Sequence, residues 1–152
     1  MTKRSQELDL KGAREIAQGC LANRMRRADR AVMHYYDEAL RPFGLKMTQF
    51  TLLVALRLRA PITINDLAKA LVMDRTTLTR NLAALARQDL ARIAPGDDRR
   101  TRLAELTAAG HSVLAEAFPE WRKAQARVRR KLGAERSDRL VQTLTETVDR
   151  LA

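Results

Sequence analysis

The chain has 152 residues, of which 45% are hydrophobic and 4% aromatic, and its 29 Lys and Arg outnumber 18 Asp and Glu to give a formal charge of +11. This length fits one domain or a compact two-part subunit, and apolar content dominated by Leu, Ala and Val favours helices over sheets. The positive charge indicates a polyanionic partner, either nucleic acid or an anionic membrane surface.

Cysteine content and hydropathy exclude several classes of protein. Cys20 is the single cysteine, so no disulfide can form within the chain and no cysteine-rich metal site is available, as is typical of a reducing cytosol. The polar stretch from Met1 to Gly12 lacks the apolar core of a secretory signal, and no run of 18 apolar residues exists that would span a membrane. We therefore expect a cytoplasmic protein with no membrane partner.

The first half of the chain reads as a series of helices. Residues 1–12 are a polar tail, and apolar residues then recur at three- and four-residue steps, which predicts a first helix over about 14–41 that stops before Pro42. A second helix begins with Thr48 as a cap and ends at Pro61. A very short extended piece over 62–64 precedes a short helix that starts at Asn65.

A helix with two different faces follows a tight turn. Asp74 is a good N-cap for a helix that runs to about Gln88, with Leu78, Leu82 and Leu85 on its apolar side. The opposite side carries short hydroxyl side chains and arginines, which can form hydrogen bonds. Such a helix is expected to bury one face and offer the other to a polar partner.

The pattern after Asp89 changes to the period of a strand. Residues 90–94 and 101–106 alternate with period two around a charged loop, which predicts a β-hairpin with a basic tip. Thr107 caps a long helix that Pro119 should kink or locally break, and Gly133 ends it before a last helix over about 135–151. The predicted fold is mainly α with a small β-hairpin wing, in the order helix, helix, strand, helix, helix, strand, wing, strand, helix, helix.

A short helix, a tight turn, a polar-faced helix and a hairpin in this order predict a helix-turn-helix followed by a wing. The second helix of such a motif reads base edges in the major groove, where Arg can pair with guanine and Thr can contact a thymine methyl. Arg99 and Arg100 project from a turn narrow enough for a minor groove, whose concentrated negative potential attracts Arg. Asp98 beside them would orient an arginine.

Several motifs carry a resemblance to a known family. They are Gly44-Leu45, Thr48-Gln49-Phe50, Leu67-Ala68, the run from Asp74 to Arg80, Asp98-Arg99-Arg100 and Leu106-Thr107-Ala108-Ala109-Gly110. In these motifs the sequence resembles the MarR family of bacterial transcription regulators over about residues 14–151. Asp89 departs from the pattern, because a glycine usually follows the recognition helix; Asp accepts a left-handed conformation at a modest cost.

The resemblance implies a homodimer with two functional parts. Residues 13–44 and 108–152 would form a helical dimerisation domain, residues 45–107 a winged helix-turn-helix domain that binds DNA, and residues 1–12 a flexible tail. Two such domains would bind a palindromic operator, with recognition helices on the order of 34 Å apart. The DNA-contacting residues would be Arg75, Thr76, Thr77, Thr79 and Arg80 in the major groove or on its phosphates, with Asp98, Arg99 and Arg100 at the wing. Repression is the family's default.

The resemblance also implies release from DNA by a small aromatic or phenolic effector that binds between the two parts. Aromatic and cationic side chains suit an aromatic carboxylate. The candidate lining residues, each of which could equally belong to the core or an interface, are Cys20, Arg24, Arg27, His34, Tyr35, Tyr36, Met47, Phe50 and Trp121.

Cys20 offers an alternative mode of control. Some relatives sense oxidants through a cysteine in the first helix, and nearby Arg24 would favour the reactive thiolate. A lone cysteine on an apolar stripe can also be a small buried hydrophobe. The basic run from Arg122 to Lys131 is open to two interpretations as well, a long-range attraction for DNA or a solvated helix face.

Two other classes of protein compete with a specific regulator. The sequence offers no glycine-rich phosphate loop, paired cysteines or metal-binding His motif, and His34 and His111 lie far apart, so we expect no enzyme, no metal and no cofactor. A nonspecific architectural DNA-binding protein would explain the charge equally well. The localised Thr and Arg face distinguishes a regulator from it, because base reading requires such a face.

Overall fold

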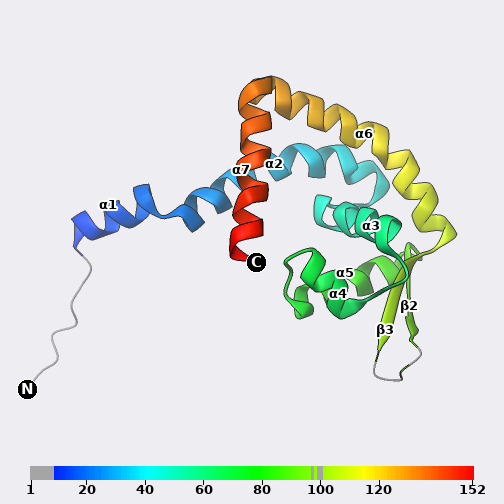
Figure 1. Ribbon diagram of the computed structural model, residues 1–152. Helices are drawn as coiled ribbons and strands as arrows, with labels where there is room; N and C mark the ends of the chain where they lie inside the picture. Colours follow the sequence, from blue (N-terminus) through cyan, green and yellow to red (C-terminus); the bar gives the residue numbers. More distant parts are fainter. Residues whose placement is uncertain (1–8, 97, 99–100) are drawn as a thin grey trace, which may run out of the picture. The chain divides into compact units, whose positions relative to one another are not determined.

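The computed structural model describes residues 9–96, 98 and 101–152 (Figure 1). The chain divides into two units, Met1–His34 and Tyr35–Ala152, and the boundary falls inside one helix. Each unit is described by itself below.

The first unit contains two helices where the sequence predicts one. Helix α1 spans Leu10–Gly19 and helix α2 spans Leu21–Leu40, with Cys20 in an extended conformation between them (φ −67°, ψ 111°). The prediction of an unbroken helix over 14–41 was therefore wrong. Gly19 has a low helix propensity, and the guanidinium of Arg24 donates to the carbonyl oxygen of Gln18 at 3.1 and 3.2 Å, which satisfies a carbonyl that the break leaves open.

The first helix begins earlier than predicted. Helix α1 begins at Leu10, because Oδ1 of Asp9 accepts a hydrogen bond from the backbone N–H of Gly12 at 2.6 Å and acts as an N-cap. The sequence predicts a tail up to Gly12, and the cap at Asp9 moves the start of the helix to Leu10.

The second unit contains the remaining elements and a small sheet. After the last residues of α2 come η1 (Arg41–Phe43), α3 (Met47–Arg59), β1 (Ile62–Thr63), α4 (Ile64–Ala70), α5 (Arg75–Arg87), β2 (Ala91–Pro95), β3 (Arg102–Leu106), α6 (Ala108–Leu132) and α7 (Ala134–Leu151). The strands form an antiparallel sheet in the order β1-β3-β2. The predicted fold class, mainly α with a β-hairpin, is confirmed. The short extended piece is β1, which pairs with β3 and adds a strand to the sheet of the hairpin.

One predicted helix start differs from the structure, and one predicted interruption leaves its helix continuous. Helix α3 begins at Met47, whose N–H donates to Oδ1 of Asp37 at 2.7 Å, so the cap comes from α2 and not from Thr48. Helix α6 continues from Ala108 to Leu132 with Pro119 inside it, so the proline does not divide the helix.

The core of the second unit fixes the helix-turn-helix. It is built around leucines that are fully buried, and these come from α2 to α5: Leu40, Leu52, Leu53, Leu56, Leu67, Leu78, Leu82 and Leu85. Helix α3 packs against α5, α6 and β3, so it links the recognition helix to the long C-terminal helix. Among the described residues, no helix has the length and apolar character needed to cross a membrane.

Candidate nucleic-acid interface and adjoining groove

Helix α5 presents the polar face that the sequence predicts. Leu78, Leu82 and Leu85 are completely buried, and their spacing leaves the opposite side of the helix exposed. Arg75, Thr76, Thr79 and Arg80 are exposed there, while Thr77 is half-buried. The hydroxyl of Thr79 donates to the carbonyl oxygen of Arg75 at 2.8 Å, so this side chain offers a methyl group and acceptor lone pairs to a partner.

Asp74 fixes the N-terminus of α5. Its Oδ1 accepts a hydrogen bond from the backbone N–H of Thr77 at 2.8 Å, as predicted for an N-cap. Hydrogen bonds from the hydroxyl and then the backbone N–H of Thr77 lower the pKa of the Asp74 carboxyl. The carboxylate therefore stays ionised. Thr77 uses both its backbone N–H and its hydroxyl in bonds to Asp74, and it is half-buried, whereas Arg75 and Thr76 beside it are exposed.

The C-terminus of α5 is joined tightly to the start of α6. Asp89 adopts a left-handed conformation (φ +56°), which explains why a glycine is usual there. The hydroxyl of Thr107 donates to the carbonyl oxygen of Asp89 and accepts from the N–H of Gly110 at 3.0 Å. A Cβ on Gly110 would lie 2.0 Å from the carbonyl oxygen of Leu90, so only glycine allows this approach.

The β2–β3 hairpin, called the wing below, follows this junction directly. Its register pairs Ala91 with Leu106 and Pro95 with Arg102, and an ion pair between Arg92 and Glu105 crosses the two strands. Asp98 is exposed, and its backbone carbonyl oxygen accepts from the N–H of Thr101 at 2.8 Å. Arg99 and Arg100, the predicted minor-groove residues, lie outside the described residues.

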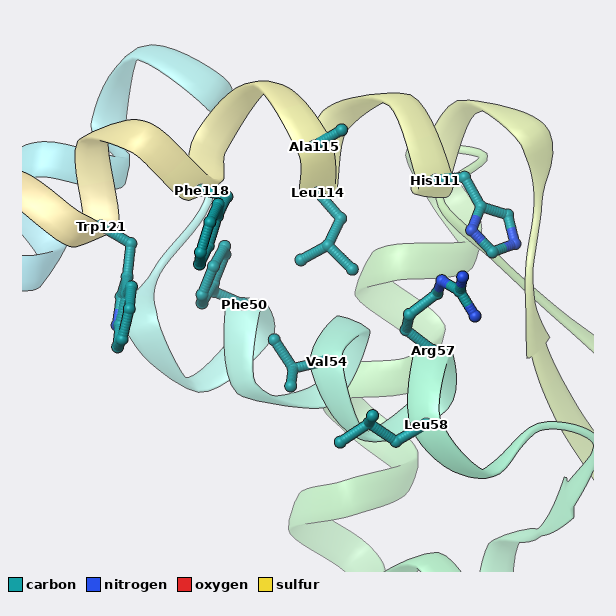
Figure 2. A pocket seen from close by; sticks show the side chains of 9 residues that line it. All are labelled: Phe50, Val54, Arg57, Leu58, His111, Leu114, Ala115, Phe118 and Trp121. Carbon is teal, nitrogen blue, oxygen red and sulfur yellow. The ribbon is translucent and has the colours of Figure 1, made fainter.

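A groove lies between α3 and α6 on the same unit. It has a volume of about 440 Å³ and is lined by Phe50, Val54, Arg57, Leu58, His111, Leu114, Ala115, Phe118 and Trp121. We call this set the α3–α6 groove. Figure 2 shows aromatic rings at one end, aliphatic side chains in the middle, and Arg57 and His111 at the other end.

The aromatic end is an ordered stack. The ring of Trp121 lies 5.8 Å from that of Phe118 and 6.4 Å from that of Phe50, with interplanar angles of 13° and 17°. Phe118 is 49% exposed, whereas Phe50 is buried in the core. The guanidinium of Arg122 lies 5.8 Å from the centroid of the Phe118 ring, so this end of the groove combines stacked rings with a cation.

Among the predicted effector-site residues of the second unit, two lie together in the groove and three lie elsewhere. Phe50 and Trp121 line the groove, whereas the hydroxyl of Tyr36 donates to Oε1 of Gln125 and the ring of Tyr35 lies 4.9 Å below the guanidinium of Arg127. Met47 packs against the core. Burial raises the pKa of the Tyr36 phenol, so it remains a neutral hydrogen-bond donor.

The remaining candidates lie in the first unit. Arg24 caps the end of α1 through Gln18, and Arg27 and His34 lie on α2. Cys20 is half-buried at the break between α1 and α2. These placements leave the proposed effector and redox roles as predictions.

Sequence reasoning missed most of the groove. Val54, Arg57 and Leu58 lie on a helix for which the sequence predicts only its bounds, and His111 enters the sequence prediction only in the argument against an enzyme. The sequence contained one indication of the groove. Arg57 and Leu58, a charged and an apolar residue, are adjacent near the C-terminus of α3, where both side chains are exposed. They line the groove together with residues of α6 that are more than fifty positions away in the sequence, and only the tertiary packing brings these residues together.

A short helix, a tight turn, a helix with an exposed polar face and an antiparallel hairpin define a winged helix-turn-helix protein. A model of the MarR family matches residues 43–101. The transcriptional regulator MosR of M. tuberculosis, solved in complex with DNA, is 39% identical, and the alignment covers 86% of this chain and 97% of MosR with a TM-score of 0.75. The chain belongs to the MarR family.

Two more distant proteins are also similar to this chain. A mutant of E. coli MarR solved with operator DNA has the same fold, with a TM-score of 0.78 at 23% identity over 92% of this chain and 99% of that one. The uncharacterized HTH-type transcriptional regulator YwoH of Bacillus subtilis (strain 168) is 29% identical over 87 residues. That alignment spans 57% of this chain and 64% of the length of YwoH.

Proposed function

We propose that this protein is a homodimeric, sequence-specific DNA-binding transcription regulator that represses from a palindromic operator. The observation that carries the proposal is the exposed Thr and Arg face of α5, which three fully buried leucines hold in a fixed orientation. Recognition helices need both properties, because base edges are read by side chains that a scaffold places in the major groove. Arg75, Thr76, Thr77, Thr79 and Arg80 would make those contacts.

The wing would supply a second contact. It continues from the C-terminus of α5 through the junction at Leu90, so its position relative to the recognition helix is fixed by backbone hydrogen bonds. An arginine at the wing tip would enter the minor groove, and we assign this role to Arg100 with Asp98 as its support, while Arg99 would contact DNA at the same tip. MosR, which is bound to DNA in its solved structure, supports a DNA-binding role for the relatives of this chain.

Exposed apolar stripes support the dimer. On α7, Leu140, Leu144, Val148 and Leu151 follow one another at four-, four- and three-residue steps, and all are at least 41% exposed. Leu10, Ile16, Leu21 and Met25 are exposed on α1 and α2. Helices with one apolar stripe are stable when the stripe is buried, and a second copy of the chain would bury both sets.

Control by a small aromatic or phenolic ligand is part of the proposal, as the mode by which the repressor leaves its operator. Binding sites for such ligands are concave and mostly apolar, with a few polar groups. The α3–α6 groove has this character. Oxidation of Cys20 is the alternative signal, and it would act on the first unit.

Selection from sheared genomic DNA of the source organism tests the proposal without a known operator. Purified protein captures fragments at physiological salt, and bound fragments are sequenced over several rounds. We expect enrichment of a small number of fragments that share an inverted repeat. Uniform recovery across the genome would contradict a specific regulator and would favour an architectural DNA-binding protein.

A further inference from the structure

We propose that Val72, in the turn between α4 and α5, is a specificity-determining residue that contacts the 5-methyl group of an operator thymine. The inference deepens the proposed function and rests on it, because it adds an apolar contact to the polar face of α5. The sequence alone does not distinguish Val72, whereas its backbone conformation and its exposure do.

Val72 has a backbone conformation that its side chain disfavours. Its φ is +49°, in the left-handed region, where the Cβ of an L-residue lies too close to the following carbonyl oxygen. Asn, Asp and His are the side chains enriched in this region, and a β-branched residue is an outlier there. Asp89, the other described non-glycine residue with a positive φ, belongs to the tolerated kind. Val72 is therefore held in a conformation that costs the fold stability.

The hydrogen bonds at the end of α4 hold this conformation. The N–H of Val72 donates to the carbonyl oxygen of Lys69 at 3.1 Å, and the N–H of Met73 donates to that of Ala68 at 2.9 Å. This pair of bonds is a Schellman motif, in which the left-handed position is usually a glycine. The turn needs the backbone conformation and not the valine side chain, so helix capping does not explain why a valine stands there.

Packing within the chain does not explain the valine either. Leu71 and Met73 on either side pack against the core, whereas Val72 is 59% exposed. Along the described helix-turn-helix from α4 to α5, it is the one large apolar side chain that is exposed. Strained residues that persist in a fold cluster at functional sites, and this one also lacks a packing role.

The position of Val72 makes DNA the partner of this side chain. Its Cα is three residues before Arg75, the first residue of α5, and therefore at most about 11 Å from it. The turn thus lies at the N-terminal end of α5 (Figure 1). The first turns of a recognition helix face base edges in the major groove, where the thymine methyl is the apolar group. Contact between this methyl and the isopropyl group of Val72 would bury apolar surface on both partners.

Competition binding tests the contact with duplexes in which deoxyuridine replaces single thymidines of a selected genomic fragment, because this change removes only the 5-methyl group. The parent should bind one such duplex about fourfold less tightly, since one buried methyl is lost. Val72→Gly should bind that duplex and the thymine duplex equally, and it should respond as the parent does at every other thymine. Val72→Ile keeps an apolar β-branched side chain and should keep the parent's response. Asp89→Gly is the matched control, because it also places glycine at a left-handed position, and it should keep this response too.

Stability gives a second readout with the opposite sign. Val72→Gly should raise the midpoint of urea denaturation, because it removes the left-handed strain, while it lowers affinity for the selected fragment. A lower midpoint would show that the side chain serves the fold, and it would overturn the inference.

The binding outcomes separate this inference from the proposed function. Specific binding that no deoxyuridine weakens, or that each deoxyuridine weakens equally in the parent and in Val72→Gly, overturns this inference alone. Equal affinity of the parent for the selected fragment and for a scrambled duplex overturns the proposed function, and the inference with it.

Discussion

Gly110 and Asp89 show how single residues set the junction between the recognition helix and α6. The left-handed Asp89 ends α5, and the missing side chain of Gly110 lets the next helix begin against the backbone of Leu90. Thr107 bridges the two by donating to Asp89 and accepting from Gly110. The Leu-Thr-x-x-Gly motif therefore has a physical explanation in one close backbone contact.

Replacing Gly110 by alanine should destabilise the protein. The added Cβ would meet the carbonyl oxygen of Leu90 at 2.0 Å, and overpacking against rigid backbone costs about 2 kcal/mol or more. Chemical denaturation measures the free energy of unfolding. Gly19→Ala is the control, because no atom lies within 4 Å of its added Cβ, and it should be neutral or slightly stabilising. Equal stability of Gly110→Ala and the parent would contradict the close approach.

Asp74 makes stability depend on pH in acid. The Thr77 hydroxyl and backbone N–H lower its pKa, so the ionised cap contributes stability above the unfolded pKa, and this contribution is lost as pH falls through the folded pKa. Asp74→Asn keeps the cap and removes the titration. The difference in unfolding free energy between parent and variant should therefore shrink from neutral pH to about pH 3. A difference that stays constant or grows on acidification would disprove this role.

At the scale of elements, the sequence predicted features that depend on neighbouring residues better than features that depend on tertiary packing. Caps such as Asp74 and Thr107 act over three residues, and both are found as the sequence predicts. The break at Cys20 differs from the prediction, and the side-chain hydrogen bond across it joins Arg24 to Gln18, six residues away, which helix periodicity does not register. The groove was missed because its walls are distant in sequence, so its residues could not be grouped before the helices were packed.

The recognition helix and the wing should contribute differently to DNA binding. Thr79→Ala removes a methyl and an acceptor on the exposed face of α5. The free-energy preference for one base over the others should fall by about 1 to 3 kcal/mol at one operator position, while the salt dependence of binding stays the same.

Arg100→Ala should weaken operator binding with the dimer intact, because it removes the proposed minor-groove contact. Competition binding against operator variants measures both. A uniform loss for Thr79→Ala, or parental affinity for Arg100→Ala, would contradict the assignments.

At the scale of the whole molecule, apolar side chains stay exposed on α1, α2 and α7. The four residues of the α7 stripe are at least 41% exposed, and Ser137 is the one residue of α7 that is buried. The division of the chain into a tail (1–12), a dimerisation domain (13–44 and 108–152) and a DNA-binding domain (45–107) was inferred from the family resemblance. This division stays a prediction. The first unit, which contains no buried residue in α1, is the part whose stability would depend most on a second copy.

Leu144→Glu should separate the dimer. A charge in the middle of the α7 stripe would be buried without a partner, which opposes association. Light scattering after size exclusion should give the mass of one chain, and operator affinity should fall because two linked half-sites are no longer bound together. Gln142→Glu places the same charge on the opposite side of the helix and should remain dimeric. A dimeric Leu144→Glu would show that the α7 stripe does not form the interface.

The central claim is that a dimer of this chain recognises one DNA sequence through α5. Fluorescence anisotropy tests it most directly, with a selected genomic fragment and a scrambled duplex of equal length titrated at several salt concentrations. We expect the selected fragment to bind at least about 10³-fold more tightly than the scrambled duplex, with two chains per site, at every salt concentration. Equal affinity for both duplexes, with the same steep salt dependence, would contradict it.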